Sequence, residues 1–267
     1  MIFDTHAHYD DEDFDADREE LLGSLKEAGI GKVLNCAADM ESCATTIALT
    51  RKYPFVYGAV GVHPNEVGEL DEEAFQLLSS YCDEDKIVAV GEIGLDYYWD
   101  STEKEVQKEW FARQLVLADM KNLPVIIHSR EAAADTLEVL RAELRRREEL
   151  HGGEQKFEGV MHCFSYSPEI ARAVVGMGFY IGVGGVITFK NARKLVEVVE
   201  EIDLENIVLE TDCPYLAPVP YRAKRNDSRY LPYVVEKIAE IKGITPEEVI
   251  RVTTANAMRM YRMKEGA

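Results

Sequence analysis

Short apolar runs alternate with longer amphipathic segments along almost the whole chain. The apolar and β-branched runs predict strands, and they cover residues 2–6, 32–36, 55–62, 87–92, 124–128, 159–163, 179–183 and 207–211. The amphipathic segments predict helices near 16–28, 42–52, 72–82, 103–121, 131–149, 168–176, 190–201 and 228–263. The last segment predicts two helices, because Gly243 and Pro246 interrupt it. Thr245 and Glu248 have the spacing of a capping box at the start of the second helix.

Eight strand-then-helix units in one chain are typical of a (β/α)8 barrel. The chain has 267 residues, and such barrels need about 250. No Pro-, Gly- or Ser-rich linker divides it, so we predict an α/β protein with a single TIM-type barrel domain over 1–267. The alternative is an open doubly wound sheet, but no GxGxxG fingerprint follows the first strand. Gly182, Gly184 and Gly185 follow a later strand without the third glycine of that pattern.

Polar side chains gather where the predicted strands end. Active sites of parallel barrels form at the carboxyl ends of the strands. Five of the six histidines follow strand ends, namely His6, His8, His63, His128 and His162. Glu92 and Asp212 add carboxylates at two further ends, whereas His151 falls in a polar segment and is expected on the surface.

The residue types at these ends suit a metal centre. His6 and His8 are two residues apart, so they share one face of a strand. Histidine and carboxylate side chains are ligands of zinc, manganese or magnesium. The six candidate ligands are His6, His8, Glu92, His128, His162 and Asp212. Six ligands exceed one tetrahedral site and suit two ions that share a carboxylate, an arrangement that activates water and holds a phosphate.

Each of these residues also has a purely structural interpretation. An HxH pair is about as often strand packing as a site, and a lone strand-end histidine such as His63 is more often structural. Glu92 between glycines could be a turn carboxylate, and Asp212 could cap the following segment. The argument for a site therefore depends on the whole set, which places ligand types at five strand ends on one rim.

Composition narrows the choice of partner and compartment. The chain has 30 Lys and Arg against 49 Asp and Glu, a net charge of −19. This excess argues against a broad DNA-coating surface and against anionic membranes. Five cysteines without a CxxC pair argue against a disulfide framework and favour a reducing compartment. With no signal peptide or apolar run of about 18 residues, we expect a cytoplasmic protein without an obligate protein partner.

Several motifs together resemble those of the TatD family of metal-dependent DNases. They are DTHAHYD (4–10), GVHP (61–64), GEIGLDYYWD (91–100), IIHSRE (126–131), MHCFS (161–165), LETDCPYL (209–216) and YRAKRND (221–227). The resemblance spans the chain in order and implies a TIM-type barrel, two divalent ions and DNase activity, typically 3′→5′ exonucleolytic. It implies that the six candidate ligands above bind metal, with Glu92 as the bridge between the ions. The sequence departs from the family at Asn65, where many relatives carry a second histidine.

Other residues on the same rim are candidates for holding substrate. The expected substrate contacts are His63, Arg130, Tyr97, Phe164, Arg222 and Arg225. The arginines suit phosphates, and the aromatic residues, with Tyr98 and Trp99, suit unpaired bases; loop packing is at least as common a role for such rings. Asp4 and Glu210 lie one layer deeper and are expected to orient ligand imidazoles, although buried structural acids are equally common.

Together with the candidate ligands, the resemblance therefore implies a DNase that removes nucleotides from single-stranded or frayed DNA ends. Asp212 is the expected general base and Glu92 the bridging carboxylate, with magnesium, manganese or zinc as the two ions. The negative charge predicts weak binding to long duplexes. One alternative is hydrolysis of a different ester or amide, such as removal of a D-amino acid from tRNA. A second alternative is a metal-dependent binding protein without activity, for which a lost ligand would be expected.

Overall fold

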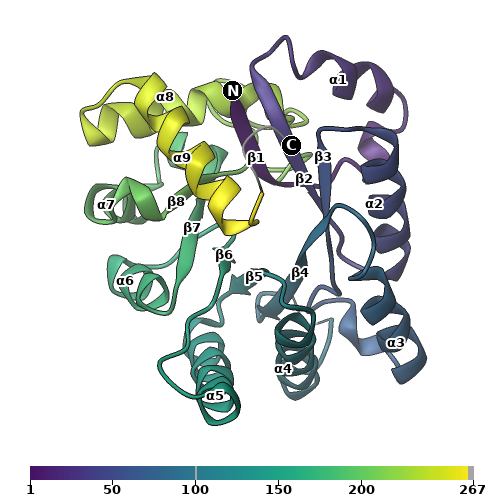
Figure 1. Ribbon diagram of the computed structural model, residues 1–267. Helices are drawn as coiled ribbons and strands as arrows, with labels where there is room; N and C mark the ends of the chain where they lie inside the picture. Colours follow the sequence, from purple (N-terminus) through teal and green to yellow (C-terminus); the bar gives the residue numbers. More distant parts are fainter. Residues whose placement is uncertain (100, 264–267) are drawn as a thin grey trace.

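Eight parallel strands form one sheet in the chain order β1 to β8 in the computed structural model, which describes residues 1–99 and 101–263. The strands are β1 (Ile2–Ala7), β2 (Ile30–Cys36), β3 (Val56–Val60), β4 (Ile87–Asp96), β5 (Val125–Arg130), β6 (Gly159–Met161), β7 (Phe179–Val183) and β8 (Ile207–Leu209). Helices follow the strands and surround the sheet on the outside (Figure 1). The predicted (β/α)8 barrel is confirmed.

The helices lie close to the predicted segments. They are α1 (Arg18–Ser24), α2 (Met40–Lys52), α3 (Glu72–Tyr81), α4 (Lys104–Lys121), α5 (Ala133–His151), α6 (Pro168–Gly176), α7 (Arg193–Glu201), α8 (Leu231–Lys242) and α9 (Pro246–Met260). The break between α8 and α9 is confirmed: Gly243 adopts a left-handed conformation, and the Thr245 hydroxyl accepts from the Glu248 N–H at 3.2 Å. No helix of the described residues is long and apolar enough to cross a membrane.

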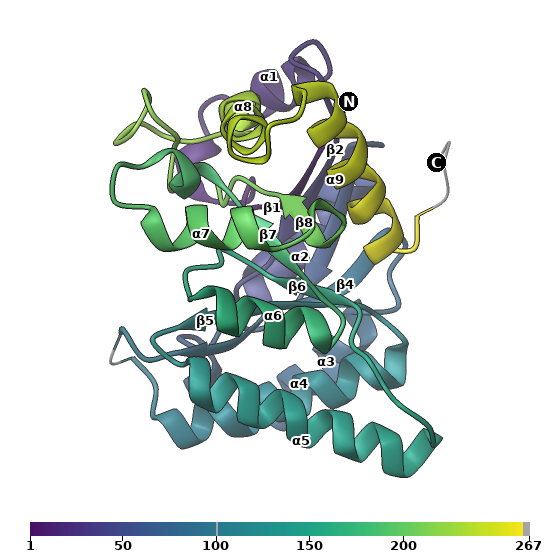
Figure 2. The ribbon, with the colours of Figure 1, turned by 90° about the vertical axis from the view of Figure 1, so that its left-hand side faces the viewer.

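Helix α9 closes the barrel at the amino ends of the strands. It crosses that end of the sheet in Figure 1 and lies obliquely beside the strands in Figure 2. Met260 and Tyr261 join a buried cluster with Phe3 and other inward-facing strand residues. The Tyr261 hydroxyl donates to the Thr5 carbonyl at 3.1 Å. The opposite end, at the carboxyl ends of the strands, is left for the candidate site.

The first and last strands meet at a seam that continues beyond the end of β8. Ala7 and Cys213 form an isolated parallel bridge. The His8 N–H donates to the Cys213 carbonyl at 2.9 Å, and the Asp212 N–H donates to the His6 carbonyl at 2.9 Å. These bonds place Asp212 beside both histidines of the HxH motif.

Among the strand boundaries that differ from the prediction, three affect the candidate site directly. Strand β4 continues to Asp96, four residues beyond its predicted end, and pairs with β5 as far as Arg130. Strands β6 and β8 end early, at Met161 and Leu209. His162 and Asp212 therefore lie in the loops that follow these strands, and the positive φ of 57° at Asp212 shows that regular strand alternation has ended there.

Candidate metal centre

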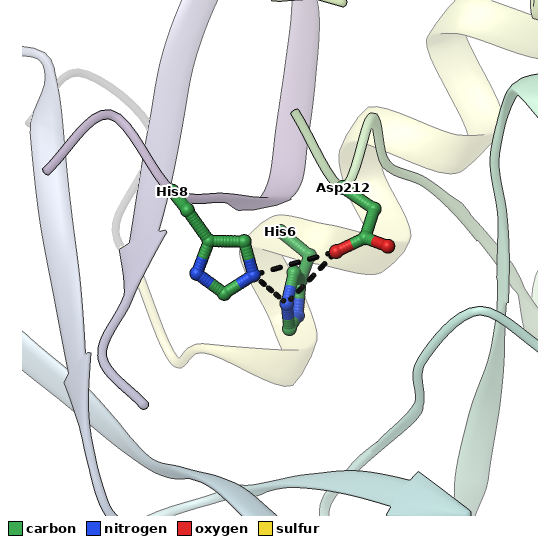
Figure 3. Close-up of side chains that lie close together, drawn as sticks. All are labelled: His6, His8 and Asp212. Carbon is green, nitrogen blue, oxygen red and sulfur yellow. Dashed lines mark hydrogen bonds and ion pairs between the residues drawn. The ribbon is translucent and has the colours of Figure 1, made fainter. Parts of the chain in front are cut away.

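The first group of metal-ligand side chains lies at the seam. The Nε2 atoms of His6 and His8 are 3.1 Å apart. Asp212 Oδ1 lies 3.3 Å from His8 Nε2 and 3.7 Å from His6 Nε2. Figure 3 shows the three side chains converging on one point, the geometry expected of ligands around a single cation.

Glu92 lies between this group and a second one. Its Oε2 atom is 3.4 Å from His6 Nε2. Its Oε1 atom is 2.6 Å from His128 Nδ1, 2.7 Å from His162 Nε2 and 3.8 Å from His63 Nε2. The carboxylate therefore offers one oxygen to each group, which is the position that a bridging ligand requires.

The two carboxylates of the cluster are ionised across the neutral pH range. Burial alone would raise the pKa of Glu92, but His162 and His128 outweigh it and hold the pKa well below its ordinary value. Burial would likewise raise the pKa of Asp212, but the hydrogen bond from His8 and the charges of His162 and His6 lower it. Both side chains are therefore in the charged form that binds cations.

Without a bound cation, the histidines of the cluster differ in protonation. Burial and the neighbouring His162 lower the pKa of His6 to about 4. Burial opposes protonation of His8 and His162 as well, but Asp212 raises the pKa of His8 to about 9, and Glu92 raises that of His162 to about 10. A divalent ion would displace these protons and supply the positive charge that holds the carboxylates together.

The donor chemistry of the cluster fits a divalent metal. Imidazole nitrogens and carboxylate oxygens suit magnesium, manganese or zinc to different degrees. Cys36 also lies near His6 and Glu92, and burial raises the pKa of its thiol well above the ordinary value, so without a bound cation it is a neutral thiol. The cluster therefore fits metal through its histidines and carboxylates.

Two histidines are oriented by groups behind them. His8 Nδ1 donates to the Cys36 carbonyl at 2.8 Å, which turns Nε2 towards the cluster. His128 Nε2 lies 3.1 Å from Asp96 Oδ2, which turns Nδ1 towards Glu92. Asp96 was not among the predicted site residues, although Glu92, Gly94 and Asp96 alternate along one strand and thus share a face.

The two deeper acids occupy different positions from each other. The Asp4 carboxylate accepts from the Thr211 N–H and hydroxyl at 3.0 and 2.7 Å and from the Ser228 hydroxyl at 2.6 Å. It thereby holds the backbone that precedes Asp212, and it supports the site through that loop. Glu210 Oε1 lies 3.9 Å from His162 Nδ1, too far for the hydrogen bond that would orient this imidazole, and accepts from the Cys163 N–H instead.

A cavity of about 710 Å³ opens above the cluster at the carboxyl ends of the strands. Its lining includes all the candidate ligands except the fully buried His6, together with His63, Asn65, Trp99, Arg130 and Tyr215. Asp10, Asp11 and Asp39 add carboxylates to the lining that Glu92 and Asp212 already make acidic. An anionic substrate would need bound cations to enter such a cavity.

The expected substrate contacts divide into two sets. His63 and Arg130 line the cavity, and His63 lies closer to the cluster than expected, within the second group. Asn65 shares this loop: its N–H donates to His63 Nδ1 at 3.2 Å, and its side chain accepts from the Ser101 hydroxyl.

His151, the one histidine expected outside the site, ends α5 and is largely exposed, as expected.

The other expected contacts have partners of their own. The Tyr97 hydroxyl donates to Asp135 at 2.7 Å, and Phe164 is buried against Tyr166. Arg225 makes a bidentate ion pair with Asp17, at 2.8 and 2.6 Å. These three side chains serve packing or loop anchoring. Arg222 stacks on Phe189 and lines a neighbouring groove of about 560 Å³, which shares Tyr215 and Leu216 with the cavity.

A comparison with known families supports the same assignment. The model of the TatD related DNase family matches residues 3–262. The chain belongs to the TatD family.

Relatives of this TatD-family chain cover nearly its whole length. It is 41% identical to the uncharacterized metal-dependent hydrolase YabD of Bacillus subtilis, over 98% of this chain and 100% of that protein. It is 35% identical to the uncharacterized metal-dependent hydrolase YcfH of Escherichia coli, over 98% and 96% of the two chains. The crystal structure of YjjV, a TatD homologue from Escherichia coli, superposes with a TM-score of 0.90 at 30% identity, over 98% of each chain. The protein is thus a metal-dependent hydrolase of this family.

Proposed function

We propose that the protein is a metal-dependent deoxyribonuclease that removes nucleotides from the 3′ ends of single-stranded or frayed DNA. The observation that carries this proposal is the position of Glu92 between two groups of ligand side chains at the floor of an open cavity. Paired metal sites of this kind suit in-line displacement at phosphorus. The family match to TatD related DNases supports the choice of DNA.

The candidate ligands divide into two sets that share Glu92. The first set is His6, His8, Glu92 and Asp212, and the second is Glu92, His128 and His162. Bound magnesium, manganese or zinc would activate a water molecule and neutralise charge on the scissile phosphate. Asp96 and the Cys36 carbonyl keep His128 and His8 oriented.

The chain's own residues perform the remaining tasks. Asp212 is ionised and lines the cavity, so it is available to take the proton of the attacking water. Arg130 also lines the cavity, and its guanidinium is suited to bidentate contact with a phosphate. Because the remaining lining is acidic, a long duplex with its many phosphates would bind weakly, whereas a chain end presents few phosphates.

A nuclease assay tests this proposal. End-labelled single-stranded and blunt duplex DNA would be incubated with magnesium or manganese, and in parallel with EDTA. We expect stepwise shortening from the 3′ end of the single strand, slower loss from the duplex and no cleavage in EDTA. Asp212→Asn should abolish cleavage and retain the far-ultraviolet circular dichroism spectrum. His151→Ala, at the exposed end of α5, should retain wild-type activity.

The same preparation can separate phosphodiester from acyl chemistry. Release of amino acid from D-aminoacyl-tRNA, without loss of nucleotides from DNA, would replace this proposal with an ester hydrolase. Near-wild-type cleavage by Asp212→Asn would instead remove Asp212 from the catalytic machinery.

A further inference from the structure

Large apolar side chains are exposed around the mouth of the cavity. Trp99 and Tyr215 each retain 55% of their accessible surface, and Tyr98 retains 50%. Trp99 and Tyr215 both line the same cavity as Glu92 and Asp212. Exposed aromatic side chains beside a polar site commonly mark where a ligand is covered.

On one side of the cavity mouth, Asp96 connects Trp99 to the candidate metal ligands. The Trp99 N–H donates to Asp96 Oδ1 at 3.3 Å, and Asp96 also contacts His128. The Trp99 ring packs edge-on against Tyr98, with centroids 4.8 Å apart. The Arg130 guanidinium lies 3.8 Å from the centre of the Tyr98 ring and 5.8 Å from that of Trp99. Trp99 is therefore placed next to a cation that can contact phosphate.

The Tyr215 side is anchored in the same way. The Tyr215 hydroxyl donates to Asp11 Oδ2 at 2.9 Å, and its backbone N–H donates to the Asp212 carbonyl at 2.9 Å. The Asn226 side chain donates to the Tyr215 carbonyl at 2.7 Å. The Tyr215 ring is thus fixed through its hydroxyl, and Asp96 fixes the backbone that carries the Trp99 ring, which lowers the entropy lost when a ligand stacks on these side chains.

We propose that Trp99 and Tyr215 are stacking surfaces for unpaired nucleobases, with Arg130 contacting the phosphate next to Trp99. This inference rests on the proposed function and adds the origin of its selectivity for single strands. A base inside a duplex is already stacked on both faces, whereas an unpaired terminal base has faces free for aromatic rings. Trp99 was among the aromatic residues expected to stack on bases, and Tyr215 replaces Tyr97 and Phe164, whose rings are engaged in packing.

The test compares two single-stranded oligonucleotides that differ only in their bases. One carries ordinary nucleotides at its 3′ end, and the other carries abasic tetrahydrofuran residues on the same phosphate backbone. We expect Trp99→Ala and Tyr215→Ala each to lower kcat/KM for the ordinary end by about 5- to 150-fold, the range that corresponds to loss of one stacked base. Cleavage of the abasic end should change less than about twofold, which also shows that each variant is folded.

Two further variants serve as matched controls. Trp99→Phe keeps an aromatic face and should restore most of the selectivity for the ordinary end. Leu150→Ala removes an exposed apolar side chain at a distant place on α5 and should change neither substrate. Equal losses on both substrates, or no loss on either, would overturn the stacking proposal.

A binding measurement separates this proposal from the nuclease proposal. The chain has two tryptophans, and Trp110 is buried against Phe75 and Arg113, so Trp99 should report base stacking. A cleavage-resistant phosphorothioate oligonucleotide should quench wild-type fluorescence, with little quenching in Trp99→Phe or by the abasic oligonucleotide. Quenching without any DNA cleavage would reject the nuclease function and support stacking. DNA cleavage without quenching would support the nuclease function and reject stacking on Trp99.

Discussion

Replacing Gly182 with alanine should destabilise the barrel, because the added Cβ atom would clash with the buried carboxylate of Glu210. Gly182 lies in β7, and a Cβ atom there would meet Glu210 Oε2 at 2.2 Å and Cδ at 2.7 Å. Ordinary contact begins near 3.4 Å, so the carboxylate would have to retreat by about 1.2 Å, the difference between those distances. Glu210 is almost completely buried, so it has little room for such a shift.

The expected loss combines overpacking with a broken hydrogen bond. Overpacking of this kind costs about 1–3 kcal/mol. Moving Glu210 would also break its contact with the Cys163 N–H, 2.5 Å from Oε1, and an unsatisfied buried donor costs about 1–3 kcal/mol. We therefore expect Gly182→Ala to lower the free energy of unfolding by about 2–6 kcal/mol.

Urea unfolding in EDTA, followed by circular dichroism, measures this loss without a contribution from metal. Gly23→Ala is the matched control, because it has the same effect on the unfolded chain and nothing lies within 4 Å of the added Cβ. It lies in α1 and should raise the stability by about 0.5–1 kcal/mol. In a Glu210→Ala background, Gly182→Ala should cost almost nothing. An equal cost in both backgrounds would refute the proposed clash.

Three further predictions concern metal, pH and one arginine. Manganese at a hundred times its dissociation constant should raise the free energy of unfolding by about 2.7 kcal/mol, with reversal by EDTA; a melting temperature that responds to neither would contradict a metal centre. Burial raises the pKa of the Asp4 carboxyl from 3.8 to about 6. The stability that the protonated carboxyl contributes to the folded state is therefore complete below pH 3.8 and lost as the pH rises through 6. Wild type should therefore lose about 3 kcal/mol relative to Asp4→Asn over that window, and parallel stability profiles in EDTA would argue against it. Arg225→Ala should cost less than about 1 kcal/mol, because its ion pair with Asp17 is partly exposed. It should leave KM for short oligonucleotides unchanged, and a large rise in KM would assign Arg225 to substrate binding after all.

The candidate ligands could be predicted because the fold determines where they meet. Parallel strands of a closed barrel all end at one rim, so polar residues after several strands converge however far apart they are in the sequence. The structure brings His6, Glu92, His128 and Asp212 together in this way. The strand pattern also carried a signal for Asp96, since the alternation that contains Glu92 continues through it.

The roles of the loop residues could not be predicted, because they depend on contacts with residues far away in the sequence. Arg225 has the sequence context of a phosphate contact, but its ion-pair partner, Asp17, is 208 residues away. The sequence could not tell whether Tyr97 or Trp99 faces the cavity, because a loop that has left the strand no longer alternates between two faces. The role of Asp4 likewise depends on Ser228, which is 224 residues away.

The seam of the barrel makes completion of the first ligand group depend on closure of the barrel. His6 lies on the first strand, His8 directly follows it, and Asp212 follows the last strand, so the first ligand group spans most of the sequence. Closing so long a loop costs chain entropy before any contact in the group can form. During synthesis from the amino terminus, the two histidines cannot form the complete ligand group until the segment carrying Asp212 has been synthesised and has docked. Metal affinity should therefore report the closure of the barrel as a whole, because a chain that stops before the eighth strand lacks one side of the site.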